Sequence, residues 1–538
     1  MAKKRKLLLF RGDKPLWIIV AALFLVSLLV VYSATAAMAY REVDGNTSYY
    51  LFRQARFIMV GFFVIIVVHW IDYKYYARYA KALFKLSIVL VLLAYVIGIS
   101  LNEAARWIKI PGTGLTFQPS ELLKVTLVMV LAQQLGIRQG VISKIPVLPP
   151  LTPSGWARNP ERSFNIWYKT TQPLIMPIVI STLVILPANF STAAILWLTC
   201  MIMLMIGRVR QRELNRLNLI AGASCLVLVA VMYIAGVGRA ETWVNRLTQF
   251  AGSTEVVADN KQTSQDSFQA QQAEIAIASG GVVGKGPGNS TQRSQLPHPY
   301  SDFAYAFIIE EYGVVGGIVV FVLYLWIFYR AGMIVRRCNR PSQGLMVLGL
   351  SLIVTMQAFV NMAVSVGLMP VTGQPLPLIS LGGSSVFFTC IAIGMILGVS
   401  RESEREQQEL EAQQRREALI AAGEIPPDAE PVETAEAAIP TGPEAEPGSG
   451  DYAPSVPPAD YETVPQEAEQ PQEPAHTPLS RPLVPRHPRT VAPPAEEDEP
   501  EEEELTLVDH GVHAVGTTGS ATGRREVVDL MDDEDHER

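Results

Sequence analysis

Long apolar segments alternate with short polar connections over the first 400 residues of the chain. A bilayer core about 30 Å thick requires roughly 20 apolar residues per helix, although shorter runs suffice within a packed bundle. The pattern therefore predicts an all-α polytopic membrane protein with about ten transmembrane helices. The predicted spans lie at 15–37, 55–71, 82–100, 117–136, 172–188, 190–206, 217–237, 303–329, 344–366 and 381–400.

The fifth and sixth spans are weaker than the others. Only Pro187-Ala188-Asn189 separates them. Such a short break leaves two alternatives, a tight helical hairpin or a re-entrant feature that does not cross the bilayer. The sequence leaves open whether both spans cross fully.

The distribution of basic residues predicts the orientation. Lys and Arg crowd the N-terminal segment 1–14 and alternate connections between spans. Because cytoplasmic loops are enriched in Lys and Arg, these segments and both termini are expected in the cytoplasm. The first span is expected to be a permanent helix, since no small-residue cleavage site precedes a soluble domain. The cytoplasmic connections are 72–85, 137–171, 208–216 and 330–340, and the outward ones are 38–54, 101–116, 238–302 and 367–380.

The charge divides the chain into two parts. Overall the chain has 49% hydrophobic and 18% charged residues, with a net charge of -7. Residues 401–538 hold 35 Asp and Glu against ten Arg. This leaves 16 acidic and 34 basic residues in 1–400, which comprise the basic N-terminus and the ten-span domain 15–400. The acidic, proline-rich segment 421–538 cannot bury enough apolar surface to offset the entropy of ordering, so we expect a disordered cytoplasmic tail. Residues 401–420 are expected to extend the last membrane helix.

The four cysteines lack the spacing of metal ligands. Cys200, Cys225 and Cys390 lie in apolar runs, where a cysteine usually acts as a small hydrophobic residue, and Cys338 stands alone. We therefore expect neither a disulfide framework nor a zinc site.

The outward connection 238–302, between the seventh and eighth spans, is far longer than a packed connection needs. Residues 265–279 have the pattern of an amphipathic helix, which would lie on the membrane surface. The glycine-rich stretch 280–288 follows, and glycines allow a backbone to approach a ligand closely. On this feature alone, contact with a phosphate or sugar competes with a purely structural turn.

Three of the few acidic residues of the membrane domain stand at the entrance to the eighth span. Asp302 directly precedes this span, and Glu310-Glu311 follow roughly two helical turns later. Carboxylates at the edge of a membrane helix normally face a bundle interior or a water-filled cavity. The alternative is that Asp302 only stabilises the positive N-terminal end of the helix.

Two further polar clusters belong to the outward side. Arg106 and Trp107 stand in the connection before the fourth span, which opens with polar residues. Glu121 and Lys124 share one face of that span, so they either pair with each other or contact a ligand. The stretch 370–385 is rich in Pro, Gly and Ser, which predicts irregular backbone leading into the tenth span.

Five motifs resemble those of the SEDS family, the membrane glycan polymerases of cell-wall synthesis. They occur in the family's order on a ten-span frame, and the resemblance covers roughly residues 10–400. Within the family, the chain resembles the division member more than the elongation member. The motifs are ARWI (105–108), FQPSELLK (117–124), ASGGVVGKGPGNSTQ (278–292), SDFAYAFIIEEYG (301–313) and GLMPVTGQPLPLISLGGSS (367–385).

The resemblance implies a peptidoglycan glycosyltransferase that polymerises lipid II, a disaccharide-pentapeptide on undecaprenyl diphosphate. In such an enzyme, a base deprotonates the 4-hydroxyl of the acceptor GlcNAc as it attacks C1 of the donor MurNAc. Asp302 matches the family's essential aspartate, so the resemblance assigns this role to it. The implied location is the bacterial plasma (inner) membrane at the division septum.

The resemblance also implies supporting residues. Arg106, Lys124 and Arg293 are candidates for binding the diphosphate, with a divalent cation such as Mg²⁺ or Mn²⁺ as an addition, and no other cofactor is assigned. Glu310 and Glu311 are expected to tune the cavity or to couple helices. The other substrate-binding candidates are Trp107, Glu121, Gly286, Gly288, Asn289, Ser290 and Gln292, and the structural candidates are Pro370, Gly382, Gly383 and Ser384.

Some residues depart from the family pattern near the aspartate. Arg293 stands where the family usually has lysine, which preserves the charge. Tyr300-Ser301 replace the usual His-Thr before Asp302. The neighbours that support Asp302 therefore do not follow from the resemblance.

The implied partner is a single-span class B penicillin-binding protein, the transpeptidase that crosslinks the new glycan. Other division proteins and membrane lipids are further expected partners, and no nucleic acid is expected. Three alternatives stay open: a lipid II transporter (flippase), a non-catalytic scaffold that recruits a transpeptidase, and the elongation-type polymerase of the same family. The outward loop ending at Asp302 favours an enzyme, because transport alone requires no external base. The tail is either a tether for division proteins or a solvating extension.

Overall fold

A computed structural model describes residues 10–35, 47–101, 104–109, 116–142, 167–236, 240–250, 261–292 and 302–424 of the chain. All of them belong to the first of the chain's two units, Met1–Ala437. The predicted disorder of the tail falls almost entirely outside the described residues.

Within the described ranges, eight helices are long and apolar enough to cross a membrane, by length and composition. They correspond to eight of the ten predicted spans, so the prediction of a multi-pass, helical membrane protein is confirmed. These helices are α2 (Lys14–Ala34), α4 (Thr47–Trp70), α5 (Tyr73–Ile97), α6 (Pro119–Ile142), α11 (Gln211–Ile234), α14 (Ala304–Arg337), α15 (Pro341–Ser365) and α16 (Gly383–Ala421).

The two weakest predicted spans form two shorter apolar helices. They are α9 (Gln172–Ile185), of 14 residues, and α10 (Phe190–Ile206), of 17 residues. Asn189 caps the start of α10, since its side chain accepts a hydrogen bond from Thr192 N at 3.1 Å. The two helices pack against each other, as expected for a helical hairpin.

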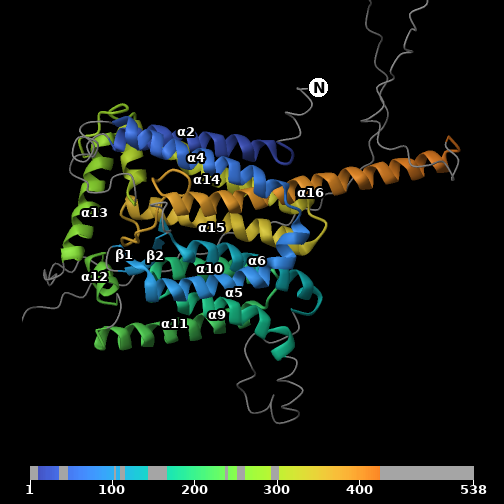
Figure 1. The fold of residues 1–538 in the computed structure, drawn as a ribbon, viewed down its shortest axis with the longest axis horizontal. Helices are drawn as coiled ribbons and strands as arrows, with labels where there is room; N and C mark the ends of the chain where they lie inside the picture. Colours follow the sequence, from blue (N-terminus) through green and yellow to red (C-terminus); the bar gives the residue numbers. More distant parts are fainter. Residues whose placement is uncertain are drawn as a thin grey trace, which may run out of the picture. The chain divides into compact units, whose positions relative to one another are not determined.

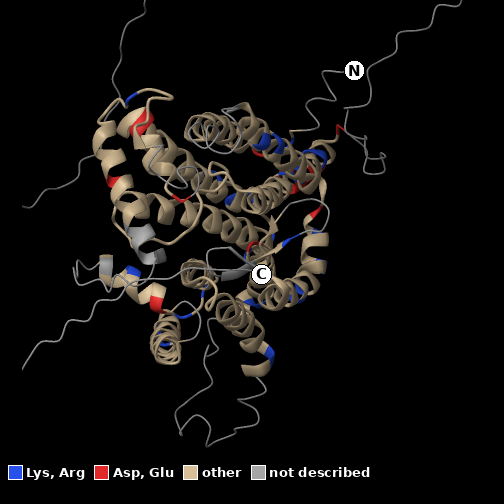
Figure 2. Ribbon diagram, turned by 60° about the vertical axis from the view of Figure 1, so that its left-hand side comes forward, with Lys and Arg blue, Asp and Glu red and all other residues tan. Residues whose placement is uncertain are grey.

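Helix α15 lies at the centre of the bundle. It packs against α6, α10, α14 and α16, and its side chains are buried along most of its length. Figure 1 shows α15 between the group of α2, α4 and α14 on one side and the group of α5, α6 and α10 on the other. Helix α11 is the least buried of the eight long helices. In Figure 2, most residues of the helices are neither Lys or Arg nor Asp or Glu, which suits contact with lipid.

A small antiparallel sheet joins α5 to α6, and the predicted all-α class did not include it. Its strands are β1 (Ile99–Leu101), β2 (Ala104–Lys109) and β3 (Thr116–Phe117), in the order β1-β2-β3. Strands of two to six residues are too short to show a period-2 pattern of hydrophobicity. They are visible only through their pairing, which matches Ile99 with Trp107 and Ile108 with Phe117.

The described part of the long outward connection contains two helices, α12 (Ala240–Phe250) and α13 (Lys261–Gly280), and the loop 281–292. The helix predicted at 265–279 is therefore confirmed. In Figure 1, α13 runs across the ends of the bundle helices. Its apolar face packs on the bundle, because Ala273 belongs to a buried cluster with Phe303 and Val364.

The predicted extension of the last span is also confirmed. Helix α16 continues without a break from Gly383 through residue 421. Beyond the span it is tied to the α4–α5 turn, where Arg401 Nη2 pairs with Asp72 Oδ1 at 2.9 Å and Glu402 Oε2 accepts from Tyr73 N at 2.9 Å.

Candidate active site

Asp302 lies in the turn immediately before α14 and is half-buried. Its backbone carbonyl accepts a hydrogen bond from Asn361 Nδ2 at 2.7 Å. Its carboxylate borders the connection from α15 to α16, because a Cβ atom placed on Gly373 would lie 3.6 Å from Asp302 Oδ2. The N-cap residue of α14 is Phe303. Asp302 therefore stands one residue before the N-cap position, close enough to the helix N-terminus to stabilise its positive end as well.

Two amide side chains on one face of α15 connect the polar clusters that the sequence singled out. Asn361 Nδ2 also donates to Gln374 O at 2.8 Å, and one helical turn earlier Gln357 Nε2 donates to Pro375 O at 3.1 Å. Gln357 Oε1 accepts from Lys124 Nζ at 2.8 Å. Both amides are buried. Helix α15 thus ties the entrance of α14, the connection to α16 and the start of α6 to one another.

Lys124 and Glu121 form the ion pair that their spacing predicts, at 2.9 Å, and both side chains are almost fully buried. A buried ion pair is stable only when further hydrogen bonds help to offset the loss of hydration. Gln357 provides one such bond to Lys124. The positive charge of Lys124 is therefore balanced by Glu121 before any ligand approaches.

The connection between α15 and α16 is anchored on both sides. Gln374 Nε2 donates to Thr192 Oγ1 of α10 at 2.9 Å, and Ser27 Oγ of α2 donates to Ile379 O at 2.9 Å. Irregular backbone within a membrane domain requires protein partners for its polar groups, and these contacts supply them. The irregular backbone predicted for 370–385 is confirmed up to the start of α16.

The remaining predicted residues of this segment lie where α16 begins. Pro370 belongs to the connection, and Gly382 is the N-cap residue of α16. A Cβ atom on Gly383 would lie 3.1 Å from the Phe57 ring, so this glycine permits close packing of α16 on α4. Among the described residues, the buried Ser384 hydroxyl has no hydrogen-bond partner.

Two of the predicted cationic residues fall outside what the structure describes. The side chain of Arg106 and the whole of Arg293 are not described, whereas Trp107 is a half-buried residue of β2. Over the described ranges, no three His, Cys, Asp or Glu side chains gather as a metal site. We therefore assign no protein ligands to a divalent cation.

The glycine-rich loop after α13 fills a break in α14. Gly313 has φ 71° and ψ -177°, which interrupts the helix at that residue. Lys285 N and Gly286 N of the loop donate to the carbonyls of Glu310 and Glu311, at 3.0 Å and 2.9 Å. These carbonyls belong to the last helical turn before the break, and the loop satisfies them in place of the missing helical turn.

The loop also satisfies the first amides after the break. Val314 N donates to Gly281 O at 3.0 Å, and Val315 N donates to Val282 O at 3.3 Å. The two backbones lie so close that a Cβ atom on Gly313 would overlap the carbonyl oxygen of Val282. Glycine is needed here both for its positive φ and for this close approach.

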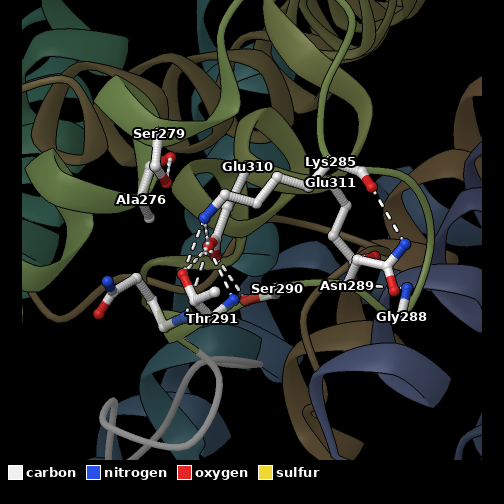
Figure 3. Close-up of polar contacts among 10 residues, drawn as sticks. Ala276, Ser279, Lys285, Gly288, Asn289, Ser290, Thr291, Glu310 and Glu311 are labelled. Carbon is white, nitrogen blue, oxygen red and sulfur yellow. Dashed lines mark hydrogen bonds and ion pairs between the residues drawn. The ribbon is translucent and has the colours of Figure 1, made fainter.

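The buried carboxylate of Glu310 holds the end of the same loop (Figure 3). It accepts from Lys285 Nζ at 2.7 Å, from Thr291 N and Oγ1 at 3.0 Å each, and from Gln292 N at 3.4 Å. The Ser290 hydroxyl donates to its other oxygen. Side chains and backbone amides of the loop therefore converge on this one acid.

Glu311 holds the middle of the loop and connects it to α2. Its Oε1 accepts from Gly288 N at 3.0 Å and from the Ser33 hydroxyl. Gly288 N is shared with Ser33 Oγ at 3.1 Å. The contacts of Glu310 and Glu311 are those of residues that couple helices to a loop.

These contacts bear on the alternatives for the glycine-rich stretch. The amides of Gly286, Gly288 and Gln292 already donate to groups of α14. A phosphate bound by them would have to displace a carbonyl or a carboxylate. Asn289 Nδ2 donates to Lys285 O at 3.1 Å. The described loop is thus a structural brace, and substrate contact by its residues stays a prediction.

The sequence reasoning missed Gln357, Asn361 and Gln374. Gln357 and Asn361 stand four residues apart in an otherwise apolar span, which places two amides on one helical face. Polar side chains inside a membrane helix usually face other helices or a cavity. That spacing was the signal available for the two α15 residues, whereas Gln374 carries none.

The chain is similar to known proteins over its membrane domain. Residues 13–405 match the model of the FtsW/RodA/SpoVE family of cell cycle proteins. The chain is 28% identical over 402 residues to a protein of Halomonas elongata named "Probable peptidoglycan glycosyltransferase FtsW", covering 73% of this chain and 92% of that protein. A protein of the same name from Nitrosococcus halophilus is 30% identical over 403 residues, covering 73% and 94%.

A solved structure has the same fold. It is a chain of a peptidoglycan synthase complex described as coordinating polymerization and crosslinking. The TM-score is 0.53 at 24% sequence identity, and the match covers 73% of this chain and 98% of that one. At this identity, the similarity shows the fold alone.

Proposed function

The chain belongs to the FtsW/RodA/SpoVE family of cell cycle proteins, the SEDS family, and we propose that it is a peptidoglycan glycosyltransferase that polymerises lipid II during septal cell-wall synthesis. The relatives bearing the name peptidoglycan glycosyltransferase support the reaction class. In this proposal the enzyme acts on the outer face of the bacterial plasma membrane, with both termini in the cytoplasm.

The proposed reaction joins two lipid-linked disaccharides. The 4-hydroxyl oxygen of the acceptor GlcNAc attacks C1 of the donor MurNAc, and the bond from C1 to the diphosphate oxygen breaks. Asp302 takes the hydroxyl proton as general base, and undecaprenyl diphosphate leaves with the bonding electron pair. A base must sit at the membrane boundary, because the sugars are in water while the lipid stays in the bilayer.

One observation carries this proposal. Three polar clusters far apart in the sequence meet through α15: the turn of Asp302, the connection around Gln374, and the buried Lys124. Asp302 is half-buried, and its carboxylate lies beside the glycine of the connection between α15 and α16.

The leaving diphosphate requires positive charge. Glu121 already neutralises the charge of Lys124. We therefore assign the binding of the diphosphate first to Arg106 and Arg293, with Lys124 as a further contributor. Arg106 and Arg293 stand in the predicted outward connections 101–116 and 238–302, on the side where the anionic lipid head group would be.

The test is polymerisation of labelled lipid II in detergent by the chain purified with its transpeptidase partner. Wild type is expected to form glycan strands, and Asp302→Ala is expected to form at least about 100-fold fewer. Glu274→Ala, which removes an exposed carboxylate of α13, is the matched control and is expected to behave like wild type.

Two results contradict the proposal at different points. If wild type makes no strands but moves lipid II across vesicle membranes, the transporter function replaces the polymerase. If wild type and Asp302→Ala make equal amounts of polymer, only the assignment of the base is wrong.

We further propose that the partner is a class B penicillin-binding protein and that the acidic tail is a cytoplasmic tether for other division proteins. The family and the peptidoglycan synthase complex of the structural relative support the partner. Deleting residues 421–538 is expected to weaken septal localisation, measured by fluorescence microscopy. Normal localisation of the deletion variant would leave the tail as a solvating extension.

A further inference from the structure

We infer that Asn361 is a positioning residue for Asp302, acting through the backbone rather than through the carboxylate. This inference rests on the proposed function, since it concerns the base of that reaction. Its physical basis is that one buried amide nitrogen of α15 donates to two segments at once, to Asp302 O at 2.7 Å and to Gln374 O at 2.8 Å.

The first bond orients the turn before α14. An amide nitrogen carries two hydrogens in one plane, so two acceptors bonded to it are held in a defined relative position. Asn361 holds the carbonyl of Asp302 from the centre of the bundle. Asn361 itself is almost fully buried, with a relative exposure of 1%, so its own position is set by packing.

The second bond brings the facing segment to the carboxylate. Gln374 follows Gly373, the glycine that lies beside Asp302 Oδ2. Gly373 has φ +63°, a conformation that favours glycine. Gln374 is in turn bonded to Thr192 of α10 at 2.9 Å. Asn361 therefore sets the separation between the base and the wall that faces it.

Gln357 connects the same segment to Lys124 in the way that Asn361 connects it to Asp302. It donates to Pro375 O at 3.1 Å and accepts from Lys124 Nζ at 2.8 Å. The two amides hold consecutive carbonyls, those of Gln374 and Pro375, from consecutive turns of α15. The connection is thus fixed at two points, and Asn361 is the point nearest to Asp302.

A displacement of about 1 Å in a catalytic group commonly costs on the order of 100-fold in rate. Asn361→Leu keeps the size of the side chain but removes both donors. We expect kcat for lipid II polymerisation to fall about 10- to 100-fold per folded molecule, with KM for lipid II changed less than about threefold. We also expect the acidic limb of the pH–rate profile to shift, because the surroundings of the base change.

Gln343→Leu is the matched control. Gln343 is a fully buried amide on the same helix, about 27 Å from Asn361 along the axis, and neither of its polar atoms has a hydrogen-bond partner among the described residues. We expect this variant to keep wild-type kcat, KM and pH profile. Asn361→Gln retains an amide donor and is expected to recover part of the activity that Asn361→Leu loses.

A second measurement is independent of activity. The pair Asp302→Cys and Gly373→Cys is expected to form a disulfide readily under mild oxidation, detected by mass spectrometry. Adding Asn361→Leu is expected to slow that crosslinking several-fold, while adding Gln343→Leu is not.

The outcomes separate this inference from the proposed function. Crosslinking that slows only with Asn361→Leu supports positioning even if wild type makes no polymer, in which case the proposed function alone is wrong. Unchanged crosslinking together with an unchanged kcat and pH profile in Asn361→Leu would overturn the inference. Equal losses in Asn361→Leu and Gln343→Leu would also overturn it, because they would indicate a general effect of burying leucine in α15.

Discussion

Two groups of acidic residues stand near the start of α14, and their surroundings differ. Asp302 is half-buried, and its described neighbours hold its backbone and leave a glycine beside its carboxylate. Glu310, eight residues later, is fully buried and accepts hydrogen bonds from four residues of one loop. The entrance of α14 thus has one acid that we propose as the base, and α14 itself has one acid that holds a loop.

The difference shows that a carboxylate at a membrane boundary does not indicate catalysis by its position alone. A base must be able to gain a proton from a substrate, so it needs space and a free lone pair. When N–H and O–H donors surround a carboxylate, they stabilise its ionised form. The carboxylate in turn holds the segment that carries the donors in place. For Glu310, its complete burial and its four donor residues indicate a structural role, which its spacing along the helix does not.

The largest expected effect contrasts the two acids directly. Asp302→Asn should lower the polymerisation rate about 10²- to 10⁴-fold, because an amide cannot act as the base, while the free energy of unfolding changes little. Glu310→Gln should lower the free energy of unfolding and keep activity per folded molecule. Rates with labelled lipid II and SDS titration in mixed micelles measure the two effects. A loss of activity in Glu310→Gln without loss of stability would break the comparison.

The next effect concerns the ion pair that closes the loop. Lys285→Met should lower the free energy of unfolding by about 3 kcal/mol, because it leaves the buried Glu310 without its counter-ion. The double variant with Glu310→Gln should lose less than the sum of the two single changes. Arg405→Met, which breaks an exposed ion pair with Glu409 on α16, is the control and should have no measurable effect. Additive losses in the double variant would contradict direct coupling.

A smaller effect is expected from the break in α14. Gly313→Ala should cost about 1–3 kcal/mol of stability, because the residue has a positive φ and faces the Val282 carbonyl. Gly332→Ala, on the same helix with open space around it, should be neutral or stabilising by up to about 1 kcal/mol. Equal behaviour of the two variants in the SDS titration would show that the loop does not require a break.

The smallest effect is expected at the contact with α2. Ser33→Ala removes one hydroxyl from Glu311 and should cost about 1 kcal/mol in the same titration, with unchanged polymerisation. Thr389→Ala on α16 removes a buried hydroxyl that bonds only its own helix at Ser385 O, and it should cost less. A larger loss of activity than of stability in Ser33→Ala would place Glu311 in the reaction.

The sequence by itself determined the membrane class, most helices and the segments that carry chemistry. Runs of about 20 apolar residues, the continuation of α16, and the helix of 261–280 follow from local composition and periodicity. The pairing of Glu121 with Lys124 follows from spacing on a helix. These features depend on residues that are neighbours in the chain, so the chain alone records them.

Only the tertiary structure decided which polar residues meet. Asn361 bonds to Asp302 across 59 residues and Lys124 to Gln357 across 233, and no local pattern specifies such contacts. The tertiary structure likewise assigned the glycine-rich loop to the break in α14, because the loop's amides and the helix's carbonyls satisfy one another only after both are packed. Hydrophobicity sets where the helices form, and the pairing of buried polar groups sets how the site is built.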